Sequence, residues 1–199
     1  MKKIFLLAGV LLFCLESSKG FADVKIVTTS TNLAALALAV GGDQVSVKSL
    51  TKGTQDPHFA AAKPSMIRKL YGADLLLLVG ADQEIAWLPA ALQAGRNARV
   101  QPGRSGYLDL SDTVTLLDVP TGPVTRAMGD VHAKGNPHYL LDPRNGARAA
   151  AAIAARLQAI DPENADAYRS RLGIFTATLD RKLAEWKGKL RGFQGKSVV

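Results

Sequence analysis

An unbroken apolar run, Leu75 to Val79, narrows the possible folds of this chain more than any other feature. Asp74 precedes the run and Gly80 follows it, as is typical of a strand set between polar ends. Because no residue in the run is polar, both faces of the strand must be covered by other parts of the chain. Strands of this kind belong to parallel sheets with helices on both sides, so we predict an α/β fold.

The segments around this run alternate between strand and helix patterns, with proline or hydroxyl residues at helix starts and glycine at helix ends. The alternation predicts a mostly parallel sheet with flanking helices and right-handed crossovers. Strands are expected at 24–29, 44–50, 75–79, 107–110 and 115–118, and helices at 33–40, 64–71 and 84–93.

The chain becomes helical after residue 143. A first helix is expected from Pro143 to about Ile160, and Asp161-Pro162 marks the start of a second, much longer one. Apolar residues recur in it three or four positions apart over about 28 residues, a stripe roughly 42 Å long. The stripe consists of Tyr168, Leu172, Phe175, Leu179, Leu183, Trp186 and Leu190. A small lobe does not need so long a helix, so we expect a connecting helix and a truncated chain whose second α/β lobe is missing.

The first residues have the features of an export signal. A lysine pair starts the segment, and residues 4–15 form an apolar stretch too short to span a bilayer. The small-residue pattern that follows predicts cleavage after Ala22. A lipid on Cys14 is the alternative, but the bulky aromatic residue before that cysteine fits it poorly. We expect a periplasmic protein that keeps no cysteine after cleavage.

The formal net charge is +8. Lysines and arginines are spread along the chain, and acidic residues, Asp180 and Glu185, interleave with the one dense basic run at 181–191. Because an exported protein meets little nucleic acid, we interpret the charge as a solvated surface and expect no nucleic-acid partner. We also expect a monomer.

Two short segments place a histidine directly after a proline: residues 56–58 (Asp-Pro-His) and 136–138 (Asn-Pro-His). The proline ring fixes φ, and the short polar residue before it can bond the local backbone. His58 and His138 are thus held on stiff loops, as suits a ligand that must lie about 2.0–2.1 Å from a zinc-like ion. A turn histidine that only bonds its own loop is the alternative for both.

Two further residues belong to this hypothesis. Asp142 lies four positions after His138 and could accept its second ring N–H, cap the helix that starts at Pro143, or do both. His132 completes the three histidines of the chain. It could be a third ligand, a gate over the entrance, or merely exposed.

Evidence for catalysis is weak. Glu84 and Trp87 could form a general base and a stacking platform, but we favour Trp87 as a core residue and Glu84 in the first turn of its helix. An exported metal-dependent hydrolase would use Glu84 or Asp142 as its base. The sequence has no HExxH, CxxC, P-loop or GxSxG element, so we expect no enzyme and no catalytic residue.

Several stretches are characteristic in combination: residues 53–59 (Gly-Thr-Gln-Asp-Pro-His-Phe), 63–65, 73–75, 84–89 and 135–143. The first four resemble the N-terminal lobe of the zinc/manganese ABC-transporter substrate-binding proteins, and 135–143 resembles the second ligand loop of that family. The stretch 161–164 and the long helix are similar to its rigid interlobe helix. The match covers nearly all of the chain beyond the export signal.

The resemblance implies a periplasmic receptor that captures a divalent metal and delivers it to a membrane permease driven by a cytoplasmic ATPase. Four protein ligands are implied, two per lobe, of which this chain carries His58 and His138. The long His-rich loop of many zinc-specific members is absent, with only His132 in its place. Zinc is the expected cargo and manganese the alternative. A metal-binding adhesin or storage protein with the same fold is the alternative function.

The expected organisation has four parts. Residues 1–22 form the signal peptide, 23–142 the N-terminal metal-binding lobe, 143–194 the helical segment, and 195–199 the start of a truncated second lobe.

Overall fold

The computed structural model describes residues 23–58, 60–125 and 131–197, and its centre is a four-stranded sheet. The strands are β1 (Val24–Thr28), β2 (Val45–Ser49), β3 (Leu75–Leu78) and β4 (Tyr107–Asp109). Their order is β2-β1-β3-β4, and every neighbouring pair is parallel. The parallel α/β sheet predicted from the sequence is confirmed.

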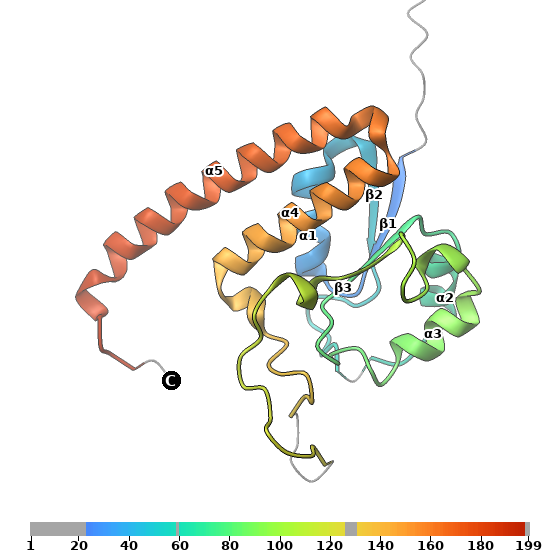
Figure 1. The fold of residues 1–199 in the computed structure, drawn as a ribbon, viewed down its shortest axis with the longest axis horizontal. Coiled ribbons are helices and arrows are strands. Elements are labelled where there is room, and N and C mark those ends of the chain that lie inside the picture. The colour runs from blue at the N-terminus through green and yellow to red at the C-terminus, as the bar shows by residue number, and fades with distance from the viewer. Residues whose placement is uncertain (1–22, 59, 126–130, 198–199) are drawn as a thin grey trace, which may run out of the picture.

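Helices cover both faces of this sheet (Figure 1). The first face carries α1 (Thr31–Gly41), α4 (Pro143–Ile160) and α5 (Ala165–Leu190), which pack against one another. The second face carries α2 (Pro64–Tyr71) and α3 (Leu88–Gly95). Helix α2 begins at the predicted proline and ends before Gly72, and the Ser30 side chain caps α1.

Alternate residues of β3 enter different cores. Leu75 and Leu77 join the core under α1, α4 and α5, whereas Leu76 and Leu78 join the core under α2 and α3. All four side chains are almost fully buried. This two-sided burial explains why the strand is apolar along its whole length.

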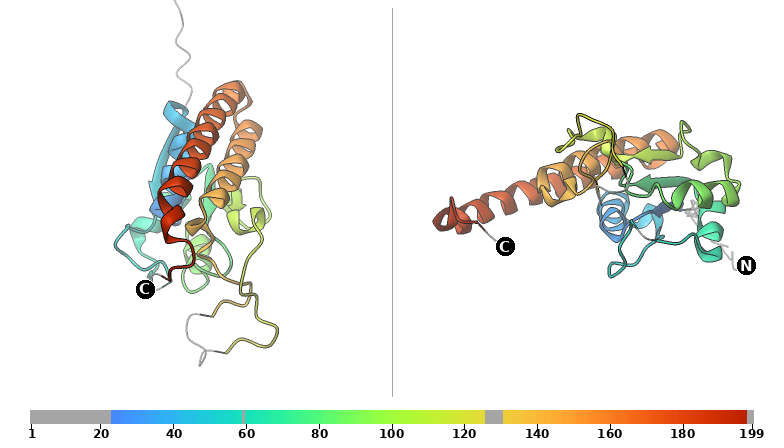
Figure 2. Two further views of the ribbon diagram at one scale, coloured as in Figure 1. Left: turned by 90° about the vertical axis from the view of Figure 1, so that its left-hand side faces the viewer. Right: turned by 90° about the horizontal axis from the view of Figure 1, so that it is seen from below.

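Helix α5 is only partly covered. It has 26 residues, which corresponds to about 39 Å. Tyr168 is buried near its start, but Trp186 and Leu190 near its end are 40% and 61% exposed. Figure 2 shows this end projecting away from the sheet. The predicted apolar stripe is therefore packed on the core over its first half alone.

Two sequence expectations for the elements are wrong. The helix expected at 84–93 starts at Leu88, because residues 81–87 form turns whose first members have positive φ. Residues 115–118 form no strand, and Asp118 has a φ of 55°, which is incompatible with extended backbone.

The ends of the chain are described in part. Residues 1–22, with the expected signal peptide and Cys14, lie outside the described residues, as do 198 and 199. Lys196 and Ser197 follow a turn and belong to no strand. Of the helices that the structure describes, none combines the length and apolar character needed to cross a bilayer.

Candidate metal centre

His58 lies on a turn stabilised by the residue two positions before it. The Oδ1 atom of Asp56 accepts the backbone N–H of His58 at 2.9 Å and lies 2.8 Å from the ring Nδ1. A carboxylate bonded to one ring nitrogen leaves the other, Nε2, as the metal-binding atom. The backbone N–H of His58, followed by its ring, holds the pKa of Asp56 below its usual value, so this carboxylate is ionised at neutral pH. The sequence predicted the turn but not the bond to the ring.

His138 lies on a turn of the same construction. The Oδ1 atom of Asn136 accepts the backbone N–H of His138 at 2.9 Å. Two further bonds hold Asn136 in place. Its backbone N–H donates to the carbonyl of Leu117 at 2.8 Å, and its Nδ2–H donates to the carboxylate of Asp118 at 3.1 Å. The two proline-histidine segments therefore fold alike, although among the described residues only the first brings a carboxylate to its imidazole.

Both turns bring their rings to one place beyond the carboxyl ends of the strands, together with a third ring. The ring centres of His58 and His138 are 5.6 Å apart, and those of His58 and His132 are 5.0 Å apart. The Nε2 atoms of His58 and His132 lie 3.1 Å from each other. Two nitrogens bound to one tetrahedral zinc ion lie about 3.3 Å apart, given bonds of about 2.0–2.1 Å. This pair is thus close to the spacing of two ligands on one ion.

The arrangement is not a closed site. Within the described ranges, no group of three or more His, Cys, Asp and Glu side chains is arranged to hold a metal ion. His132 and His138 line a small pocket of about 170 Å³, with Asp118 also on its wall. The side chain of His58 is 14% exposed, whereas His138 is an exposed residue.

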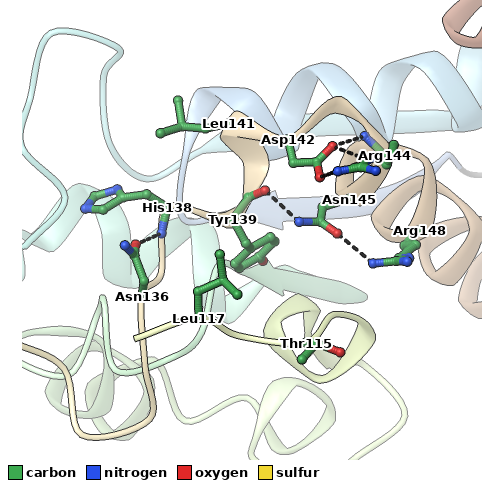
Figure 3. A pocket seen from close by; sticks show the side chains of 10 residues that line it. All are labelled: Thr115, Leu117, Asn136, His138, Tyr139, Leu141, Asp142, Arg144, Asn145 and Arg148. Atoms are coloured by element: carbon green, nitrogen blue, oxygen red, sulfur yellow. Dashed lines mark hydrogen bonds and ion pairs between the residues drawn. The ribbon is translucent and has the colours of Figure 1, made fainter. Parts of the chain in front are cut away.

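His138 also lines a larger cavity of about 550 Å³. Figure 3 shows the imidazole at one edge of this cavity and Asp142, Arg144 and Arg148 at the opposite edge. Asp142 accepts the backbone N–H of Arg144 at 2.9 Å and also binds its guanidinium, which lowers the pKa of Asp142 to about 2. Of its two expected roles Asp142 fills the cap; its carboxylate bonds Arg144 in this structure and not His138.

Glu84 has a role that the sequence analysis missed. It is 3% exposed and lies in the turns before α3, not in the first turn of the helix. Its carboxylate accepts the hydroxyl of Thr29 at 2.5 Å and the backbone N–H groups of Val79 at 2.9 Å and Gly80 at 3.1 Å. Burial raises the pKa of Glu84, and the three donors oppose that rise. Both oxygens are engaged, which argues against a general base.

Trp87 is a core residue, as predicted, with 2% exposure. Its indole N–H donates to the carbonyl of Pro57 at 2.8 Å, so the residue directly before His58 is tied to the β3–α3 segment. The sequence offered no signal for this contact between residues thirty positions apart.

Comparisons with known proteins identify the family of this chain. A sequence profile described as "Zinc-uptake complex component A periplasmic", or ZnuA, matches residues 26–199. The chain belongs to the ZnuA family. The resemblance drawn from the sequence is therefore confirmed, and the family consists of substrate-binding proteins of ABC transporters rather than enzymes.

Individual relatives of the ZnuA family differ in the metal that their names give. The manganese ABC transporter substrate-binding lipoprotein PsaA of Streptococcus pneumoniae is 28% identical over 94% of this chain and 59% of its own length. The iron-transport lipoprotein MtsA of Streptococcus pyogenes is 26% identical, over 83% of this chain and 51% of its own. A zinc-bound crystal structure of a ZnuA deletion mutant has a TM-score of 0.71 and 28% identity, covering 85% of this chain and 59% of the other. The chain thus spans between half and three fifths of these relatives.

Proposed function

We propose that this chain is part of a periplasmic receptor that captures a divalent transition metal, with zinc as its cargo and manganese as the alternative. His58 and His138 are the proposed ligands, and His132 is a proposed third. Imidazole nitrogen is a donor that suits zinc better than manganese, which prefers oxygen. Any remaining donors come from a second lobe of the kind found in the longer relatives.

One observation carries this proposal. Two turns of the same construction, 80 residues apart in the sequence, present their imidazoles with ring centres 5.6 Å apart at the ligand-binding edge of a parallel sheet. A turn histidine that only stabilised its own loop would not need a counterpart at this distance. The ionised carboxylate of Asp56 behind His58 is the partner usual for a metal-bound histidine.

The remaining parts of the proposal follow the family. The receptor delivers its ion to a membrane permease driven by a cytoplasmic ATPase, catalyses no reaction, and acts as a monomer without nucleic acid. Export with cleavage after Ala22 brings it to the periplasm. Residues 23–142 form the metal-binding lobe, 143–194 the connecting helices, and 195–199 lead into the second lobe.

Competition titration of the purified chain against a chromophoric chelator tests the proposal. Zinc is expected to bind more tightly than manganese, and His58→Ala and His138→Ala are each expected to abolish binding. Retained affinity in either variant refutes the assignment. His132→Ala separates two roles. If His132 is a ligand, its removal raises the dissociation constant. If it is a gate, its removal changes the association and dissociation rates together and leaves the dissociation constant unaltered.

A further inference from the structure

All three histidine-bearing loops are attached to one segment, the β3–α3 connector, defined as residues 79–87. Trp87 at its end donates to the carbonyl of Pro57, next to His58, at 2.8 Å. Val79 at its start accepts the hydroxyl of Tyr139, next to His138, at 2.8 Å. His58 and His138 therefore each have an immediate sequence neighbour bonded to this connector.

The third histidine loop makes a weaker link to the same segment. Lys134, two positions after His132, lies 3.4 Å from the carboxylate of Asp82. The lysine side chain is 62% exposed, so solvent screens this ion pair and the link contributes less than the hydrogen bonds of Trp87 and Tyr139.

The connector itself is held in an unusual conformation. Gly80, Ala81 and Asp82 have φ values of 78°, 50° and 65°, three successive left-handed residues of which two are not glycine. Backbone of this kind persists only where its surroundings over-determine it. Here Glu84 accepts the N–H of Gly80, and Ser111 accepts the N–H of Ala81 at 3.2 Å. The connector is thus held by bonds to Glu84 and Ser111 that involve neither proline-histidine loop.

We propose that the β3–α3 connector is a common support that sets the positions of the imidazoles relative to one another, with Trp87 and Tyr139 as positioning residues. The proposal rests on the proposed function, because it assigns these residues to the same metal site. Ligand geometry must be held to within about 0.5 Å for tight binding. Tyr139 is 8% exposed and Trp87 is 2% exposed, so the bond from Tyr139 to Val79 is buried and the bond from Trp87 to Pro57 is shielded on its indole side.

Two tyrosine variants form a matched test. Tyr139→Phe removes the hydroxyl that bonds Val79 and keeps the ring. Tyr168→Phe removes a similarly buried hydroxyl that bonds Asp161 on the α5 side, away from the histidines. Both changes delete one hydrogen bond made by a buried tyrosine, so a general loss of stability is expected to appear in both thermal unfolding curves.

Cobalt is the probe, because its visible absorption reports coordination geometry. Titration of the purified chain is expected to show Co²⁺ binding about tenfold weaker in Tyr139→Phe, with an altered spectrum. Tyr168→Phe is expected to match the wild type in both respects. Equal affinity and equal spectra in the two variants would overturn the proposal.

A measurement without metal separates this inference from the proposed function. Long-range ¹H–¹⁵N spectra of the imidazoles are expected to shift for His138 and His58 in Tyr139→Phe and to stay unchanged in Tyr168→Phe. If the wild type binds no Co²⁺ and these shifts still occur, the proposed metal binding is refuted, whereas the role of the connector as a common support is retained. If the shifts are absent, the support fails whatever the metal result. Glu84→Gln serves as a second variant should Tyr139→Phe not fold. The glutamine has a similar size but places an amide donor near the N–H of Gly80, so the signals of His58 and His138 are expected to shift.

Discussion

The carboxylate behind His58 gives the sharpest test of the metal site. Asp56→Asn keeps an Oδ1 atom that can accept the backbone N–H of His58 and so preserves the turn, whose bond is 2.9 Å long. The change removes the negative charge 2.8 Å from the ring Nδ1. A neutral amide holds the imidazole less firmly and makes its other nitrogen a weaker donor to the metal.

The expected loss follows from the exposure of the pair. Removing such a partner of a metal-bound histidine lowers metal affinity by about 10- to 100-fold. The side chain of Asp56 is 55% exposed and that of His58 is 14% exposed, so solvent screens the carboxylate more than the ring. The loss is therefore expected near the lower end, about tenfold.

Competition of the purified chain with a chromophoric chelator for Zn²⁺ measures this ratio. The lowered pKa of Asp56 keeps its carboxylate charged at neutral pH. The titration is therefore made at about pH 8, well above the ordinary imidazole pKa of about 6.5, where proton competition is small. Asp74→Asn is the matched control, because Asp74 accepts a backbone N–H of Lys25 at the opposite end of the sheet. An Asp56→Asn affinity within about twofold of the wild type would refute a role of this charge in metal binding.

Three further predictions concern the rest of the molecule. Ile153→Ala in α4 empties a position that is 0% exposed, and urea denaturation is expected to show a loss of about 2–5 kcal/mol in the free energy of unfolding. Leu190→Ser changes a residue that is 61% exposed, so the same measurement is expected to differ from the wild type by no more than about 0.5 kcal/mol. Burial raises the pKa of Glu84 above 4.5, so the folded state binds a proton at Glu84 more tightly than the unfolded state does. The stabilisation that this proton gives is lost as the pH rises. The free energy of unfolding of the wild type relative to Glu84→Gln is thus expected to increase from pH 7 to pH 5, and a constant difference would contradict the raised pKa.

Local signals in the sequence were enough for most of the elements. Pro64 and Gly72 bound α2 because proline suits a first helical turn and glycine a helix end. The start of α3 was missed, since the left-handed residues from Gly80 to Asp82 depend on bonds to Glu84 and Ser111. Pro89, in the first turn of the real helix, was the available signal.

The candidate site was also predictable only in part. The turns at His58 and His138 were predictable, because a short polar residue before a proline bonds the backbone locally. The approach of His132 to His58 was not, since it joins residues 74 positions apart. Asp142 offered two partners in sequence, and its near neighbour Arg144 took both oxygens. Contacts within a few residues can be inferred from spacing, whereas contacts across loops need the fold.

The buried carboxylate of Glu84 limits which ligands can bind at the carboxyl edge of this sheet. The strand order reverses between β1 and β3, and Glu84 bridges the residues just beyond both strands, Thr29 on one side and Val79 and Gly80 on the other. In many open α/β sheets such a gap takes up the phosphate of a nucleotide or cofactor. Here a resident anion, supplied by the chain itself, already uses the N–H and hydroxyl donors. A phosphorylated small molecule would find this gap between β1 and β3 already filled and negatively charged. A ligand of this lobe is therefore expected to bind on the loops beyond the gap.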